Sequence, residues 1–386
     1  MLAMHTAFTR EVDEVDAALG ELIDQINPGR LEKNSVGLLN CHSDFLEEGI
    51  AGALCKKLPF DIVGMTTMAT ANQNHFDMYG LCLTVLTSDT GVFETAVTGP
   101  LTAGNYRRTI EEAYTRTRGR LPGDPAFIIA YFPTLNDVGG ASMLRAFDSA
   151  CGGIPIWGGL TAGVDMRYEK SLVFRNGEET SPNTLVMALV YGPVEPEFVV
   201  TSIPKQNIGD SKGLITASNG CILREVNGAP VLNYLGDLGI AVRSEDAAAL
   251  PLMPLMLDYG DGSGPVALSI VLLREDGSAL CSGEMPQGGT IALGAITKES
   301  ILDTTGASLE KILSRKRNGL LLLPCVSRYT MLAPNQTDEI KLIAETTAGR
   351  IPYMLGYCGG EVCPVRDKNG TYHNRFHNYT FSACMV

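Results

Sequence analysis

The sequence is short of basic residues: 30 Lys and Arg stand against 43 Asp and Glu, which gives a formal net charge of −13. A chain with this balance lacks the cationic surface that phosphate backbones and anionic membranes attract, so we expect no nucleic-acid partner. The densest basic run is Arg315-Lys316-Arg317. Long apolar runs are also missing. Stretches such as Val266 to Leu273 fall well short of the roughly 20 residues that cross a bilayer, so no membrane span is predicted.

Paired cysteines and catalytic signatures are absent as well. The ten cysteines are scattered, no Cys-x-x-Cys pair occurs, and most lie in apolar runs where a thiol acts as a small hydrophobe. No apolar secretory segment opens the chain, because acidic residues recur from Glu11 to Asp16. A reduced, cytoplasmic protein fits these features. The sequence has no phosphate-binding loop, no Gly-x-Ser-x-Gly and no His-Glu-x-x-His, which argues against the enzyme classes that need them.

What the chain does contain is typical of a globular protein with two domains. Hydrophobic residues make up 45% and charged residues 19% of 386 residues, which is more chain than one ordinary core accommodates. The turn signal Asn227-Gly228 follows the strand-like segment Cys221 to Val226. A helix-like stretch restarts at Val231. We therefore place the domain boundary near Gly228.

A pattern of strand, helix, glycine-broken strand and return strand occurs three times. Its nine apolar runs are 36–39, 62–67 and 81–86 in the first copy, 126–130, 156–161 and 185–191 in the second, and 320–323, 354–359 and 379–385 in the third. The recurrence indicates a repeated supersecondary unit. We predict an α/β or α+β fold with mixed β-sheets and helices on the outer faces, built from these units in two halves.

Apolar periodicity predicts four helices. They cover 9–26, 137–151, 297–317 and 337–347. The segments 267–273 and 279–282 flank a polar turn and predict a hairpin.

Three polar clusters stand in the apolar C-terminal segment. Cys325 and Arg328 follow one strand-like run, Gly356-Tyr357-Cys358-Gly359-Gly360-Glu361 follows the next, and His377-Asn378-Tyr379-Thr380 opens the last. Polar groups that converge in an apolar environment need partners, and a small polar ligand provides them. The parallel strands of an open α/β sheet place such groups at their carboxyl ends. We therefore predict one cavity that contains Arg328, Glu361, His377, Asn378 and Thr380, roofed by the 356–360 turn.

The same clusters resemble the C-terminal half of the FIST family of intracellular sensory domains. The Cys-x-x-Arg element, the Gly-Tyr-x-x-Gly-Glu element and the closing His-Asn-x-Thr element all occur, although Ser327 stands where the family usually has Gly and Cys358 where it has an aromatic. The resemblance implies a FIST N-terminal domain over 35–228, a FIST C-terminal domain over 229–386, and a helical lead-in over 1–34.

This resemblance also implies a function in signal transduction. It implies a small polar ligand such as an amino acid, and ligand-binding residues Arg328, Gly356, Tyr357, Gly360, Glu361, His377, Asn378 and Thr380. The signal would pass to a separate protein such as a kinase or a cyclic-nucleotide enzyme. No cofactor and no metal is predicted, but some members of the family are reported to hold haem, so a haem-binding gas or redox sensor remains an alternative.

Several alternatives stay open at the level of individual residues. Arg328 and Glu361 either contact a zwitterionic ligand or form an ion pair with each other. His377 is a ligand contact, a proton acceptor or a hydrogen-bonded core histidine. A thiol-imidazole enzyme with Cys325 as nucleophile and His377 as base is a further alternative. A purely structural scaffold would leave the polar clusters without a role.

Overall fold

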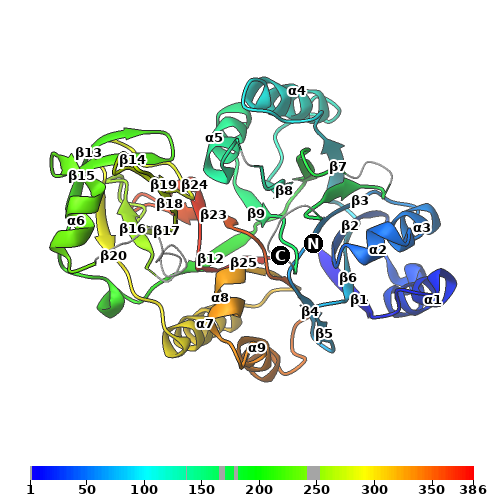
Figure 1. Ribbon diagram of the computed structural model, residues 1–386. Helices are drawn as coiled ribbons and strands as arrows, with labels where there is room; N and C mark the ends of the chain where they lie inside the picture. Colours follow the sequence, from blue (N-terminus) through cyan, green and yellow to red (C-terminus); the bar gives the residue numbers. More distant parts are fainter. Residues whose placement is uncertain (1, 136, 165–169, 178–180, 241–252) are drawn as a thin grey trace.

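Three units with one strand order surround the centre of the molecule, as Figure 1 shows. The computed structural model describes residues 2–135, 137–164, 170–177, 181–240 and 253–386. The strands of the first unit lie side by side in the order β1 (Ala3–Thr9), β6 (Leu81–Ser88), β2 (Asn34–Cys41) and β3 (Ile62–Thr66). Those of the second unit follow the order β7 (Val92–Val97), β11 (Val186–Tyr191), β8 (Phe127–Phe132) and β9 (Ile156–Leu160). Those of the third unit follow the order β12 (Glu197–Thr201), β25 (Phe381–Met385), β21 (Leu320–Pro324) and β22 (Tyr353–Gly356). In each unit the last two of these strands are parallel and the other pairings antiparallel. The predicted α/β architecture with a repeated unit is confirmed.

The three sheets are completed by strands exchanged between units. β10 (Val173–Arg175) of the second unit pairs with β3 of the first, and β4 (Thr70–Asn72) of the first, which carries β5 (Phe76–Asp77), pairs with β22 of the third. β23 (Glu361–Arg366) of the third unit, followed by β24 (Tyr372–His377), pairs with β9 of the second. Along the chain, each exchanged segment lies between the glycine-broken strand of its own unit (β3, β9 or β22) and the return strand (β6, β11 or β25). The exchange therefore links the units in a ring and joins both halves of the chain through shared sheets.

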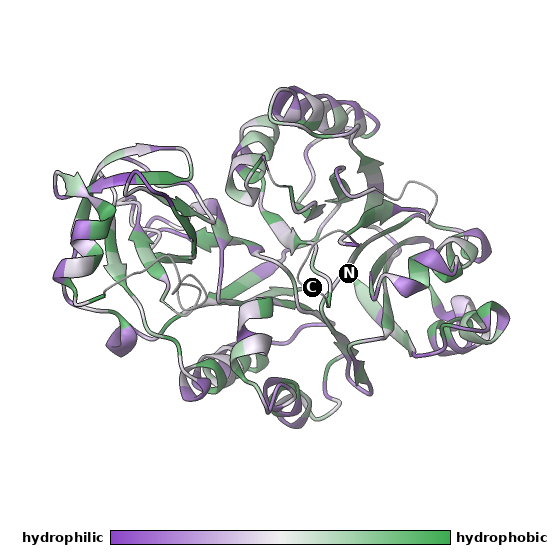
Figure 2. Cartoon of the chain, in the orientation of Figure 1, coloured by the Kyte–Doolittle hydropathy of each residue, from purple (hydrophilic) through white to green (hydrophobic). Residues whose placement is uncertain are grey.

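Helices cover the outer face of each unit, and Figure 2 shows hydrophilic residues on the outward side of helices such as α4. The helices are α1 (Val15–Ile26), α2 (Asp44–Glu47) and α3 (Ile50–Lys57) on the first unit, α4 (Tyr106–Arg118) and α5 (Gly140–Cys151) on the second, and α7 (Lys298–Leu313), α8 (Val326–Met331) and α9 (Asp338–Thr347) on the third. Short 3₁₀ turns occupy Pro28–Arg30 and Lys205–Asn207. The inner faces of the sheets meet in one central core that includes Leu38, Ile129, Trp157 and Leu323. Strands buried on both faces explain the near-continuous apolar runs.

A fourth, antiparallel sheet is inserted between β12 and β21. Its strands are β13 (Gly213–Asn219), β14 (Ile222–Val226), β15 (Ala229–Pro230), β16 (Leu255–Asp258), β17 (Val266–Leu268), β18 (Ile270–Leu273), β19 (Ala279–Cys281) and β20 (Thr290–Leu293), with α6 (Val231–Asp237) packed beside them. The predicted hairpin corresponds to β18 and β19, whereas 266–268 forms a separate strand paired with β16.

Two helix boundaries differ from those that periodicity predicted. The first helix begins at Val15, and Ala3–Thr9 is a strand, so 1–34 is a strand followed by a helix rather than a helical lead-in. The strand forms because it supplies backbone hydrogen bonds to the outer edge of the return strand β6. Local periodicity does not reveal this pairing, since β6 is distant in the sequence. The helix α7 ends at Leu313, and both Arg315 and Arg317 pair with Glu197 instead of continuing it.

Candidate functional site

The segments at the ends of the three glycine-broken runs meet at the centre of the ring. Residues 66–69, 160–162 and 356–360, which we call the central junction, are joined by backbone hydrogen bonds from Ala162 N to Thr66 O (3.1 Å), Met68 N to Tyr357 O (3.0 Å) and Leu160 N to Gly360 O (2.8 Å). Glycine is required here because backbones approach closely. A Cβ atom on Gly359 would lie 2.7 Å from the carbonyl oxygen of Thr161.

A layer of polar residues lies against this junction at one end of the central core. The polar layer consists of Asn40, Thr67, Tyr131, Cys325, Cys358, Glu361 and Thr380, all of them buried. Strand register explains part of the grouping: Gly159 pairs with Tyr131 on one side and with Glu361 on the other, so all three point to the same face. Gly159 has no side chain, so the Sγ atom of Cys358 occupies the space between Tyr131 and Glu361. It lies 2.8 Å from the position that a Cβ atom on Gly159 would take.

Glu361 is the ionisable group of this layer. Its Oε2 atom accepts hydrogen bonds from Thr380 Oγ1 (2.6 Å) and Thr380 N (3.2 Å), and the Cys358 thiol lies 3.6 Å from Oε1. Burial raises the pKa of Glu361 to about 8, against the opposing effect of the Thr380 hydrogen bonds. Burial at this position therefore favours the uncharged carboxylic acid over the carboxylate.

Other members of the layer have unpaired polar atoms. Across the part of the chain that the structure describes, Asn40 Nδ2 and Oδ1, Thr67 Oγ1 and the Tyr131 hydroxyl are buried without a hydrogen-bond partner. Asn40 and Thr67 both adjoin Gly356, where an added Cβ would be 2.4 Å from Asn40 Nδ2. Asn40 also lies beside Cys82 in the register of β2 and β6. Burial together with nearby Cys82 and Cys358 raises the pKa of Tyr131, which places its hydroxyl among the same groups.

Arg328 is held by a different set of residues. Its guanidinium donates to Glu339 Oε1 (2.7 and 3.0 Å), to Ile301 O (2.8 Å) and to Tyr379 O (3.3 Å). Glu339 Oε2 also accepts from the Tyr357 hydroxyl at 2.8 Å. The two carboxylate oxygens and the guanidinium are thus satisfied within the protein, and both side chains are fully buried.

The prediction that Arg328 and Glu361 share one cavity or pair with each other is therefore wrong. Tyr357, which contacts Glu339, packs in the outer core beneath α7 and α9, whereas the next residue, Cys358, packs in the central core beside Glu361. The peptide between Tyr379 and Thr380 separates the two side chains. Arg328 donates to its carbonyl oxygen and Glu361 accepts from its N–H, and these two groups of a trans peptide point in opposite directions. The turn at 356–360, with Gly356 and Gly360, lies at the central junction between the two groups.

The remaining predicted residues, His377 and Asn378, form hydrogen bonds within the third unit and its insertion. His377 is within 3.1 Å of Cys363 O through Nε2, and burial lowers its pKa to about 4, so it is neutral. Asn378 donates through its backbone N to Ala267 O (3.0 Å) and accepts through Oδ1 from Ser282. Both partners lie in the segment inserted between β12 and β21. These contacts match the hydrogen-bonded core role that was one of the alternatives for His377.

The thiol-imidazole alternative gains no geometric support. No hydrogen bond joins Cys325 to His377 in the described residues, and burial together with Glu361 raises the pKa of the Cys325 thiol far above its usual range. A thiol in this state is a poor nucleophile. Within the same described ranges, no group of three or more His, Cys, Asp and Glu side chains is placed to hold a metal ion. The described helices include none that is long and apolar enough to cross a bilayer.

Sequence reasoning missed Asn40, Thr67 and Tyr131. The signal that would have found two of them is the repeat itself: aligning the three units by their strand registers puts Asn40, Tyr131 and Leu323 at one equivalent position. Two polar residues at a position that points into an apolar core indicate a shared polar function there, because an unpaired buried polar group is costly.

The fold is a three-unit α/β ring with a polar layer buried at one end of its central core. The model of the FIST N domain matches residues 35–229, and that of the FIST C domain matches residues 231–364. The chain belongs to the FIST family, whose domains are associated with small-ligand sensing in signalling.

Two further comparisons add little. Among solved structures, a cyanuric acid hydrolase described as an evolutionary innovation by structural concatenation is similar at a TM-score of 0.30 and 10% identity, over 77% of this chain and 100% of that chain. The comparison with curated proteins found no match.

Proposed function

We propose that the protein is a sensor that binds a small zwitterionic metabolite, such as an amino acid, in the polar layer. The observation that carries the proposal is the set of buried polar atoms without partners at Asn40, Thr67 and Tyr131, in the described residues of the same layer as the carboxyl group of Glu361. The amide and the two hydroxyls offer donors to a ligand carboxylate. Glu361 offers an acceptor to a ligand ammonium group, the complementary half of a zwitterion.

The position of the layer supports the signalling part of the proposal. Asn40, Tyr131 and Glu361 come from three different units, and each is 0% exposed. A ligand therefore reaches the layer only when the central junction opens, and once bound it contacts all three units. Binding that favours one arrangement of the units over another shifts the population between them. A separate signalling protein, such as a kinase or a cyclic-nucleotide enzyme, would detect that shift.

Tyr131→Phe tests the site with a change of a single atom. Because the hydroxyl is buried without a partner, its removal should leave the ligand-free protein at least as stable as the wild type. Ligand affinity should fall by about 1.5–3 kcal/mol, because one hydrogen bond to a charged group is lost. Thermal shift with a panel of amino acids identifies the ligand, and calorimetry measures the affinity.

The matched control for that variant is Tyr191→Phe. Its hydroxyl is also buried without a partner in the described chain, but the Tyr191 side chain packs in the core beneath α4 and α5, away from the layer. Tyr191→Phe should bind the ligand like the wild type. Equal loss of affinity in both variants, or no loss in Tyr131→Phe, would show that the ligand does not occupy the polar layer.

The pH dependence of binding tests the role of Glu361. A ligand ammonium binds the ionised carboxylate, and with a pKa of about 8 only a minor fraction is ionised at pH 7. Apparent affinity should therefore rise with pH, by about tenfold per unit below pH 8, and level off above it. Binding should release a proton, which calorimetry detects in buffers of different ionisation enthalpy. In Glu361→Gln the pH dependence should vanish; its persistence there would assign it to another group.

Two alternatives remain as predictions. A Soret band after incubation with haem would support a haem sensor. Rapid alkylation of Cys325 in the native protein would support the thiol-imidazole enzyme, and the burial of this thiol leads us to expect slow alkylation.

A further inference from the structure

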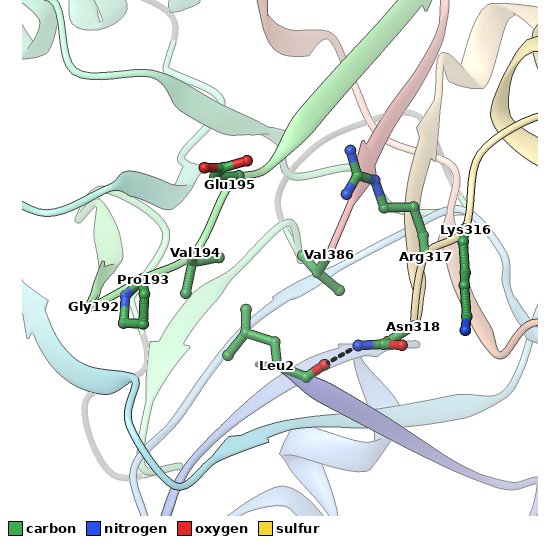
Figure 3. A pocket seen from close by; sticks show the side chains of 9 residues that line it. All are labelled: Leu2, Gly192, Pro193, Val194, Glu195, Lys316, Arg317, Asn318 and Val386. Carbon is green, nitrogen blue, oxygen red and sulfur yellow. Dashed lines mark hydrogen bonds between the residues drawn. The ribbon is translucent and has the colours of Figure 1, made fainter.

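A separate cavity opens away from the central junction. It has a volume of about 700 Å³ and is shown in Figure 3. Its lining comes from all three units: Leu2 precedes β1, residues 192–195 connect β11 to β12, residues 316–318 precede β21, and Val386 follows β25. Asn318 Nδ2 donates to Leu2 O at 2.7 Å and so ties the first unit to the third at the wall of the cavity.

The cavity is apolar at its base. Leu2 and Val386 are only 3% and 8% exposed, and with Val194 they contribute aliphatic surface to the lining. Figure 3 shows these three side chains between Glu195 on one side and Lys316 and Arg317 on the other. A volume in this range fits a small organic molecule, and the apolar base suits an aliphatic body.

The cationic wall is formed by the densest basic run of an otherwise acidic chain. Arg315 and Arg317 both pair with one carboxylate, that of Glu197, so two guanidinium groups share a single negative charge. Lys316 has no ion pair within the described part of the chain, and Arg317 Nε is buried without a hydrogen-bond partner there. This wall therefore carries excess positive charge and an N–H donor without a partner in the described chain, the Nε of Arg317. Both suit a carboxylate or phosphate group.

We propose that this cavity binds an oxyanion-headed small molecule with an aliphatic body, at a site distinct from the polar layer. The head group contacts Lys316 and Arg317, and the body packs on Leu2, Val194 and Val386. Because the walls belong to three units, such a ligand stabilises their association and acts as a second input to the protein.

The test is a calorimetric titration of the full chain with octanoate and with heptyl phosphate, which carry the same heptyl chain. At least one of them should bind with one molecule per chain, and the tighter of the two identifies the head group. Heptylamine, which has the same heptyl body and the opposite charge, should not bind. Lys316→Gln should weaken binding by about tenfold, because a hydrogen bond to a charged group is lost. Lys316 is exposed, so this variant should fold normally.

Three further variants sharpen the result. Lys311→Gln removes an exposed lysine on α7 that does not line the cavity and should leave affinity unchanged. Glu195→Gln removes a negative charge from the cavity wall and should tighten binding of the anion. Tyr131→Phe should have no effect, which separates this site from the polar layer. Absence of binding by both anions, equal binding of heptylamine, or equal affinities in Lys316→Gln and Lys311→Gln would overturn the proposal.

Discussion

Arg328→Ala should destabilise the protein by about 3–5 kcal/mol, because it leaves a buried carboxylate without its charge partner. Glu339 is 0% exposed and receives two of the arginine's hydrogen bonds. The substitution also removes the donors to Ile301 O and Tyr379 O, which connect α7 and the turn before the final strand to α8. Equilibrium denaturation in urea measures the loss as a lower midpoint.

Two further variants define what that loss means. Arg328→Lys retains the charge but cannot reproduce the planar set of donors, so it should also be clearly destabilised. Arg116→Ala removes an exposed arginine from α4 and should change stability by no more than about 0.5 kcal/mol. If Arg328→Ala unfolds at the wild-type midpoint and instead loses only ligand affinity, the arginine is a ligand contact, as the sequence pattern suggested.

Gly158→Ala should cost at least about 3 kcal/mol and should reduce the yield of soluble protein, because the clash is with backbone rather than with a movable side chain. A Cβ atom at this position would lie 1.7 Å from the carbonyl oxygen of Ala130 on the neighbouring strand. The pair β8–β9 could not keep its register, and β9 also carries the exchanged strand β23. Thermal unfolding and soluble yield are the measurements.

The control for that clash is Gly20→Ala. Gly20 lies inside α1 with nothing within 4 Å of an added Cβ, so alanine should stabilise the helix by about 1 kcal/mol. A Gly158→Ala protein as stable as the wild type would mean that β8 and β9 are not paired at this point.

Much of the fold could be predicted from local patterns. The apolar runs, the glycine breaks and the helical periodicity gave the three repeated units, because each depends on residues close in the chain. The candidate site was predicted less well. Glu361, Thr380 and Cys325 do lie together, but Arg328 belongs to a separate network, and Asn40 and Tyr131 were missed because no short motif marks them.

Glu339 shows why the rest needed tertiary structure. An acidic residue in the first turn of a helix is ordinarily read as a solvated residue that favours the helix dipole. In the folded protein α9 packs against α7, and this residue is completely buried opposite Arg328. Which of several carboxylates meets a given arginine depends on how helices pack, and packing is set by surfaces from distant parts of the chain.

The sequence by itself determined the class of protein, the three units and the closing polar clusters, since composition, periodicity and turn residues act locally. Tertiary structure alone decided that β4, β10 and β23 pair outside their own units, because every sheet edge needs backbone partners and a strand from any unit can supply them. That exchange brings Asn40, Tyr131 and Glu361 from three units into one buried layer. The proposed sensing site is therefore a property of the ring and not of any single segment.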